Sequence, residues 1–96
     1  MEKLEQFKPV IDVEIGESTD SKLLSRVIVY NDDWHTFDEV IIQLIKATNC
    51  MFEKARSQAF EIHTKGSCIV YKGKMSSCIK VSSILEEIAL LTQIIL

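Results

Sequence analysis

Residues 36–45 carry the pattern that most restricts how this chain can fold. Thr36 and Glu39 have the spacing of a capping box, in which each side chain accepts a hydrogen bond from the other residue's main-chain N–H. Apolar residues then recur at intervals of three and four, as one buried face of an amphipathic helix requires. They are Phe37, Val40, Ile41, Leu44 and Ile45. The rest of the chain must therefore supply an apolar surface that this helix can cover.

The neighbouring segments are suited to form that surface. Residues 26–30 are a short β-branched run that stops at the turn-forming Asn31–Asp33, so we predict a strand there. Gly66 is well placed to end a second helix. The apolar side of that helix would hold Phe52, Ala55, Ala59 and Ile62.

The C-terminal third adds further short elements. A strand is predicted over 67–71 with a turn at 72–74, and a last strand over 92–96. Between them a third helix would bury Val81, Ile84, Leu85 and Ile88. The predicted order is β-α-α-β-β-α-β, with the 72–74 turn inside a hairpin. It is typical of a small single α+β domain whose helices pack on one face of a short antiparallel sheet.

Charge divides the 96 residues into two parts. Residues 1–22 hold six acidic side chains and three lysines, which account for the whole net charge of −3, because residues 23–96 hold eight of each sign. The first part also contains the only proline, Pro9. We therefore predict a flexible acidic tail over 1–22 and a core domain over 23–96. An edge strand over 11–15, where apolar and acidic residues alternate, stays open as an alternative.

Charge and hydropathy also exclude several classes of protein. A net negative chain lacks the basic face that binding to nucleic acid requires, and no apolar run reaches the roughly 18 residues of a membrane span. Residues 1–5 lack the basic and then apolar stretches of a secretion signal, so we expect none. Three cysteines without a CxxC pair indicate a reducing compartment. We expect a cytoplasmic protein that binds neither nucleic acid nor membrane.

Two polar features are candidates for function. Asn31–Asp33 and His35 lie between a strand and a helix N-terminus, which suits either an Asx turn or a group of acceptors for a cation. His63 borders the apolar side of the second helix, where a histidine is commonly a packed side chain. The alternative function is a small metal-dependent hydrolase that binds zinc or iron through Asp32, Asp33, His35 and His63. The three glycines are too far apart for a phosphate loop, and we expect no catalysis.

Residues 26–66 also carry a family resemblance. Val27–Asp33 leads without a gap through the first helix to Glu53–Ala55, and Ile62–Gly66 has the form apolar-His-x-x-Gly. In these features the chain resembles the ClpS family, the adaptors of the ATP-dependent Clp protease. Residues 68–70 and the pair Lys80–Val81 are similar too, although less specific.

The resemblance implies an adaptor without catalytic activity, cofactor or metal. Such adaptors bind proteins by a bulky hydrophobic N-terminal residue, an N-end rule degron, and deliver them to a Clp AAA+ unfoldase and protease for degradation. The implied partners are the N-terminal domain of a ClpA- or ClpC-like unfoldase, and substrate proteins that begin with Leu, Phe, Tyr or Trp. Ile and Val are further candidates at that first position, and the adaptor is expected to be a monomer.

The resemblance also assigns residues to three groups. The substrate's α-amino group, which is protonated near neutral pH and offers three donors, would be bound by Asn31, Asp32, Asp33 and His63. Its first side chain would enter a pocket formed by Val29, His35, Phe37, Val40, Ala59 and Ile62. The unfoldase would contact Lys80 and Ser76.

The chain departs from the family pattern in three places, one of them a segment of three residues. His35–Phe37 stands where Thr-Pro-Met is usual, Ala59 replaces a methionine at the pocket mouth, and Ser76 replaces a glutamate. Loss of the methionine widens the pocket for side chains branched at Cβ, whereas the ring of Phe37 narrows it. We therefore predict a partial widening, in which Ile and Val lose less affinity than in a methionine-gated pocket.

Overall fold

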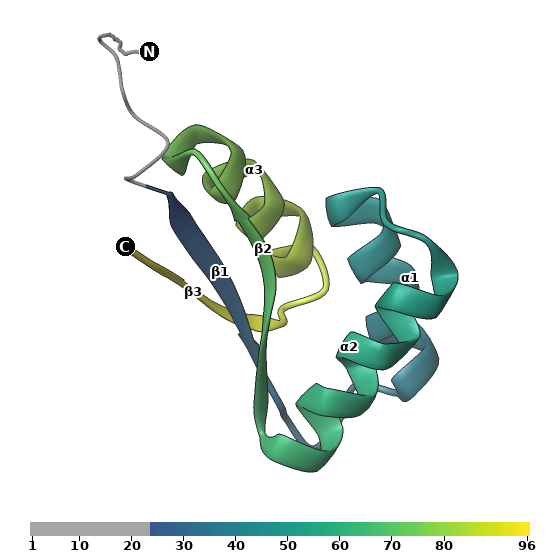
Figure 1. The fold of residues 1–96 in the computed structure, drawn as a ribbon. Coiled ribbons are helices and arrows are strands. Elements are labelled where there is room, and N and C mark those ends of the chain that lie inside the picture. Colours follow the sequence, from purple (N-terminus) through teal and green to yellow (C-terminus); the bar gives the residue numbers. More distant parts are fainter. Residues whose placement is uncertain (1–23) are drawn as a thin grey trace, which may run out of the picture.

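The computed structural model describes residues 24–96, which form a three-stranded antiparallel sheet covered by three helices (Figure 1). The elements in chain order are β1 (Ser25–Tyr30), α1 (Phe37–Thr48), α2 (Phe52–Lys65), β2 (Ser67–Gly73), α3 (Met75–Glu86) and β3 (Leu91–Ile95). The predicted α+β class is confirmed, whereas the predicted tail, with residues 11–15, lies outside the described residues. None of the helices within 24–96 is long and apolar enough to cross a membrane.

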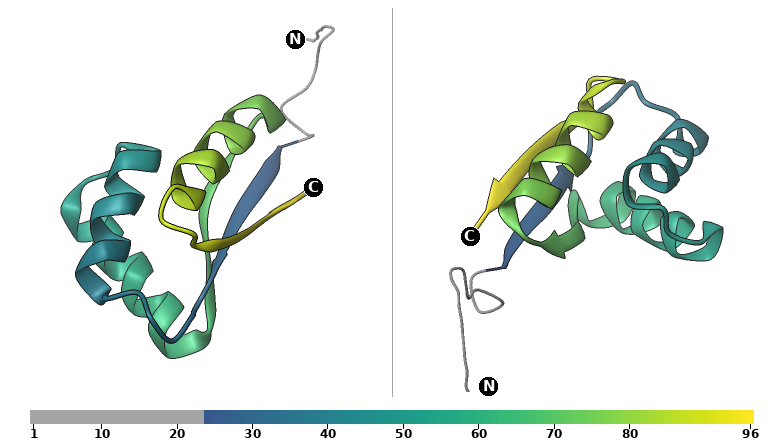
Figure 2. Two further views of the ribbon diagram at one scale, coloured as in Figure 1. Left: turned by 180° about the vertical axis from the view of Figure 1, so that it is seen from behind. Right: turned by 90° about the horizontal axis from the view of Figure 1, so that it is seen from above.

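β1 is the central strand, paired with β2 on one side and β3 on the other. Its side chains alternate between buried and half-buried, and Val27 and Val29 are completely buried on the side that the helices cover. α3 lies along the strands and contacts all three, while α1 and α2 lie beside it as an antiparallel pair (Figure 2). The core therefore lies between one face of the sheet and the helices.

α1 begins at the predicted capping box. Thr36 Oγ1 accepts the N–H of Glu39 over 3.1 Å, and the Glu39 carboxylate accepts the N–H of Thr36 over 2.8 Å. Val40, Ile41 and Leu44 are buried, as the periodicity predicts. The helix starts directly after the turn that follows β1, and this fixes residues 31–36 between two rigid elements.

The predicted hairpin after β2 is absent from the described residues, and α3 begins instead. β2 continues to Gly73, a single residue follows, and Met75 starts the helix, so the order is β-α-α-β-α-β. Gly73 is the last residue of β2 and not part of a turn, and an added Cβ there would lie 2.9 Å from the ring of Tyr71, which would have to move. Cys78 extends the buried stripe of α3 by one turn ahead of Val81.

α2 differs from prediction at its first residue. Ala55, Ala59 and Ile62 are buried as expected, but Phe52 is 55% exposed, because it opens the helix one turn ahead of the first buried position. Gly66 ends the helix with φ 92°, and its N–H donates to the Ile62 carbonyl over 3.0 Å. Glycine adopts this left-handed conformation without steric cost.

Candidate functional site

A pocket of about 360 Å³ lies where the end of β1 meets α1 and α2. The register of the sheet brings its parts together: Tyr30 pairs with Ser67, and the next N–H, that of Asn31, donates to the Gly66 carbonyl over 2.9 Å. Because Gly66 ends α2, this bond holds Asn31 beside the last turn of that helix, which carries His63. Strand pairing therefore positions the two polar residues of the pocket.

The pocket has both polar and apolar lining. Asn31 and His63, which strand pairing brings together, are among its polar groups, and its apolar side chains come from α1 and α2. The lining residues are Asn31, His35, Thr36, Phe37, Val40, Ala59, Phe60, Ile62 and His63. Seven of them are site residues predicted from the sequence, and the volume falls within the range typical of small-ligand sites.

Two lining residues, Thr36 and Phe60, were not predicted. The sequence predicts Thr36 as a helix cap, which it is, but does not indicate that Thr36 also lines the pocket. Phe60 is 59% exposed and lies off the buried stripe of α2, so helical periodicity assigns it to solvent. The sequence signal that could have placed Phe60 at the pocket is its position directly after Ala59 and three residues before His63.

Three predicted site residues do not line the pocket. Val29 is completely buried in the core beneath the helices. Asp33 is exposed on the turn and lies outside the lining. Asp32 also lies outside the lining, and its carboxylate is bound within the turn itself, so its contact with an α-amino group stays a prediction.

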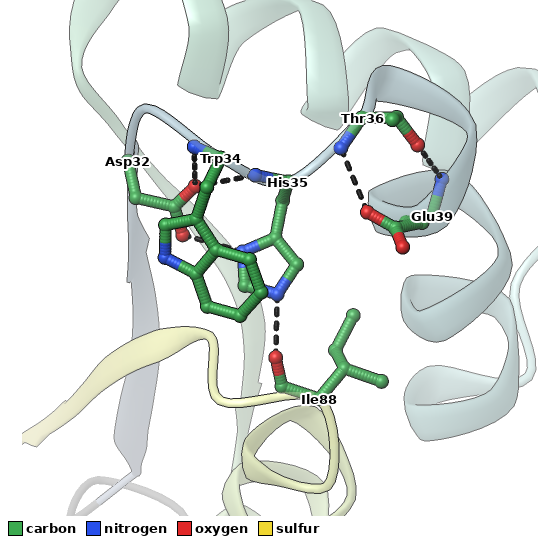
Figure 3. Close-up of polar contacts among 6 residues, drawn as sticks. All are labelled: Asp32, Trp34, His35, Thr36, Glu39 and Ile88. Carbon is green, nitrogen blue, oxygen red and sulfur yellow. Dashed lines mark hydrogen bonds and ion pairs between the residues drawn. The ribbon is translucent and has the colours of Figure 1, made fainter.

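The Asp32 carboxylate organises the turn between β1 and α1 (Figure 3). One oxygen accepts the N–H groups of Trp34 and His35 over 3.1 and 2.9 Å, and the other lies 2.5 Å from His35 Nδ1. Burial raises the pKa of Asp32, but the hydrogen bonds from the main chain and ring of His35 and from Trp34 outweigh it, so this pKa lies below its usual value of 3.8. Asp32 therefore stays ionised as part of an Asx turn.

The comparison with protein families shows to which family the chain belongs. Residues 21–93 match the family model described as "ATP-dependent Clp protease adaptor protein ClpS". The chain belongs to the ClpS family. The match spans β1, the three helices, β2 and the start of β3, so it covers every residue that lines the pocket.

A solved structure of the ClpS family has the same fold. It is Agrobacterium tumefaciens ClpS2 bound to L-phenylalaninamide, which matches with a TM-score of 0.69 at 17% sequence identity. The match covers 74% of this chain and 93% of the ClpS2 chain. At this identity the similarity establishes the fold. No curated protein sequence matches the chain.

The metal site of the alternative hydrolase is not formed in this ClpS-family domain. Among residues 24–96, no three His, Cys, Asp or Glu side chains lie close enough together to hold a metal ion. Asp32 and His35 are neighbours, but the second ring nitrogen of His35 faces the Ile88 carbonyl at 2.5 Å. His63 lies on α2, so the four predicted ligands do not converge.

The buried thiol next to α2 is also unsuited to chemistry. Burial and the nearby Glu61 carboxylate raise the pKa of the Cys68 thiol to about 11. A thiol with that pKa is protonated at neutral pH and is a poor nucleophile. Cys68 therefore acts as a small core side chain.

The two predicted unfoldase contacts, Ser76 and Lys80, lie on a second hollow of about 310 Å³. Both are exposed on α3, and the end of α1 and Tyr71 of β2 form the opposite side. The residues lining this hollow do not overlap those of the first pocket. The domain thus presents two separate concave surfaces.

Proposed function

We propose that this ClpS-family chain binds proteins through a free N-terminal amino group and a bulky hydrophobic first side chain, and delivers them to a Clp AAA+ unfoldase for degradation. The observation that carries this proposal is a single pocket lined by Asn31 and His63 together with apolar side chains of α1 and α2. An N-terminal residue has the same two parts, an ammonium group and a side chain. The proposed adaptor acts as a monomer in the cytoplasm.

The polar lining suits an ammonium group. The Asn31 amide oxygen and a neutral His63 ring nitrogen are acceptors, and the ligand offers three donors. Asp33, exposed on the adjoining turn, would add a favourable charge at short range. Asp32 would support the geometry of the turn, since both of its oxygens already accept hydrogen bonds there.

The apolar lining suits one large side chain. Phe37 and Val40 of α1 face Ala59 and Ile62 of α2 across the pocket. Burial of a Leu or Phe side chain contributes roughly 1.5–3 kcal/mol, and each hydrogen bond to the charged amine about 1.5–3 kcal/mol. The cost of association offsets part of this, which leaves an affinity on the order of micromolar, about 8 kcal/mol. The ligand of the ClpS2 structure, L-phenylalaninamide, has these same two chemical groups.

A titration with peptides that differ only in the first residue tests the proposal. We expect Phe-, Leu-, Tyr- and Trp-first peptides to bind about 10- to 100-fold more tightly than an Ala-first peptide, because alanine leaves most of the apolar lining uncovered. Isothermal titration calorimetry on the native domain gives the affinities. Equal affinity for Phe-first and Ala-first peptides would rule out the pocket as the binding site.

Ala59→Met provides the matched variant for the same titration. Ala59 is 3% exposed at the wall, and a methionine there would reach over the pocket. Ile-first peptides should lose about three- to tenfold more affinity than Leu-first peptides on Ala59→Met, because a Cβ branch conflicts with the added side chain. If the ratio of Leu-first to Ile-first affinity is the same for both proteins, Ala59 does not lie at the pocket mouth.

The second hollow is the proposed contact with the N-terminal domain of a ClpA- or ClpC-like unfoldase. Lys80 would supply the charge, Ser76 would lie beside it, and residues 1–22 would be the arm used during delivery. Lys80→Ala should weaken binding of that domain about three- to tenfold, as for other rim charges, while Phe-first peptides bind as before. Lys72→Ala, an exposed lysine outside the hollow, is the control. Equal effects of the two variants would place the contact elsewhere.

A further inference from the structure

His35 joins two segments that are far apart in the chain, the turn after β1 and the loop after α3 (Figure 3). Its Nδ1 lies 2.5 Å from the Asp32 carboxylate, and its Nε2 lies 2.5 Å from the main-chain carbonyl of Ile88. The side chain of His35 is only 3% exposed. The ring is therefore bound at both nitrogens in a nearly closed site.

Both partners of the His35 ring are acceptors. A carbonyl oxygen and an ionised carboxylate cannot donate, so the two hydrogen bonds form together only when both ring nitrogens carry protons. Burial lowers the pKa of His35, but the hydrogen bonds to Asp32 and Ile88 raise it by more, so this pKa lies above its usual value of 6.5. The geometry and the charge both favour an imidazolium.

The other charged groups near the ring act in the same direction. Besides Asp32 on the turn, the carboxylate of Glu39 on α1 favours the protonated ring. The acidic side chains that end α3 are engaged with other partners, namely Glu86 with Thr92 and Glu87 with Lys46. On the side of α3, the hydrogen-bond partner of His35 is therefore the Ile88 carbonyl, which accepts from the ring.

The hydrogen bond to Ile88 also secures a strained loop. The next residue, Ala89, has φ 60°, a left-handed conformation that residues other than glycine rarely adopt. Such strain persists only where surrounding contacts hold it. The N–H groups of Ala89 and Leu90 bond back to α3 over 2.9 and 3.4 Å, and His35 holds the carbonyl that precedes them.

We propose that His35 is a positioning residue, whose imidazolium clamps the Asn31–Asp33 turn to the Ile88 loop and so fixes the pocket wall for the peptide. The inference rests on the proposed function, because His35 lines the same pocket. The threonine that is usual here in the family has one O–H and cannot donate to both acceptors. His35 therefore forms a two-sided contact that a threonine at this position could not form.

The clamp has a defined pH window. Because the pKa of His35 is raised on folding, its contribution to stability is complete below 6.5 and is lost as pH rises through the higher folded value. The pKa of Asp32 is lowered, so its contribution is present above 3.8 and is lost as pH falls through the lower folded value. The clamp is closed between these limits and opens on the alkaline side.

Melting temperature and tryptophan emission test the clamp without a ligand. Native protein, His35→Gln and His35→Thr are compared from about pH 6 to about pH 9, across the titration of an imidazole. The melting temperature of native protein should exceed that of His35→Thr by an amount that shrinks as pH rises. The glutamine of His35→Gln donates to Ile88 without titrating, so its melting temperature should differ from that of His35→Thr by a constant amount. Trp34, the only tryptophan, stacks on His35 with ring centroids 3.7 Å apart, so its emission should titrate in native protein alone.

Peptide binding tests the positioning role. Near pH 6 the native domain should bind a Phe-first peptide about tenfold more tightly than His35→Thr does, and less than about twofold more tightly near pH 9. The peptide's own amine loses its proton at about 7.7–8.0, but this affects both proteins equally, so the ratio isolates His35. The inference would be overturned if the affinities of the native domain and His35→Thr changed in parallel with pH and the emission of Trp34 did not depend on pH. If no peptide binds while Trp34 still titrates, the proposed function fails and the clamp stands.

Discussion

N-terminal acetylation of a Phe-first peptide is expected to reduce its affinity for the domain by two orders of magnitude or more. Acetylation removes the positive charge and two of the three donors that Asn31 and His63 would accept. Acceptors left without partners beneath a bound peptide cost about 1–3 kcal/mol each, and the loss of charge adds to this. Calorimetric titration of the free and acetylated peptides measures the difference directly.

The control for acetylation is a peptide amidated at its C-terminus, which keeps the ammonium group and should bind as before. Asn31→Ala and His63→Ala should each weaken binding of the free peptide while the domain stays folded. Thr64→Ala is the matched variant, because Thr64 is exposed beside His63 and its hydroxyl bonds to Phe60 within α2. Equal affinity for free and acetylated peptides would falsify the ammonium site.

Leu44→Ala is expected to destabilise the domain by about 2–5 kcal/mol. Leu44 is completely buried on α1, the helix that contacts both α2 and α3, so truncation would leave a cavity in the shared core. For a domain of this size each 1 kcal/mol lowers the melting temperature by about 4–8 °C. Thermal unfolding followed by circular dichroism should therefore show a fall of ten degrees or more.

Ile42→Ala on the same helix is the control for this prediction. Ile42 is 64% exposed, and truncation at such a position usually changes stability by less than about 0.5 kcal/mol. The same fall in melting temperature for both variants would contradict the difference in burial between Leu44 and Ile42, because alanine does not lower helix propensity at either position. A stable Leu44→Ala would contradict the described core.

The fold was largely predictable because the strongest local signals agree with it. The capping box at Thr36 and Glu39 and the glycine at Gly66 are local hydrogen-bond and backbone requirements, and they set the ends of α1 and α2. The hairpin prediction failed because residues 72 and 73 belong to β2 and Lys74 is the N-cap of α3, so a helix follows where a second strand was expected. Lys74 makes no side-chain cap hydrogen bond and lysine is not a preferred N-cap residue, so the local pattern does not indicate a helix start there.

The site was predictable in its membership but not in all of its contacts. Spacing and family resemblance place Asn31 and His63 together, and strand pairing brings them to one pocket. The Asx turn that the sequence left open as an alternative does form, because the Asp32 carboxylate accepts the N–H groups of Trp34 and His35. The contact of His35 with the Ile88 carbonyl, 53 residues further along the chain, has no local sequence signal and was not predicted.

All residues that line the first pocket fall between Asn31 and His63, whereas Ser76 and Lys80 lie beyond this stretch on α3. The second hollow also includes Ala47, Thr48 and Asn49 at the end of α1, so the proposed surfaces for substrate and for unfoldase draw on interleaved parts of the chain. A chimera that exchanges residues 31–63 between two adaptors but keeps these three residues should transfer substrate preference and leave the unfoldase partner unchanged. Such a chimera also needs a loop whose carbonyl can accept from His35, as that of Ile88 does. The pocket residues lie in one stretch of the chain, but their arrangement depends on this one distant carbonyl.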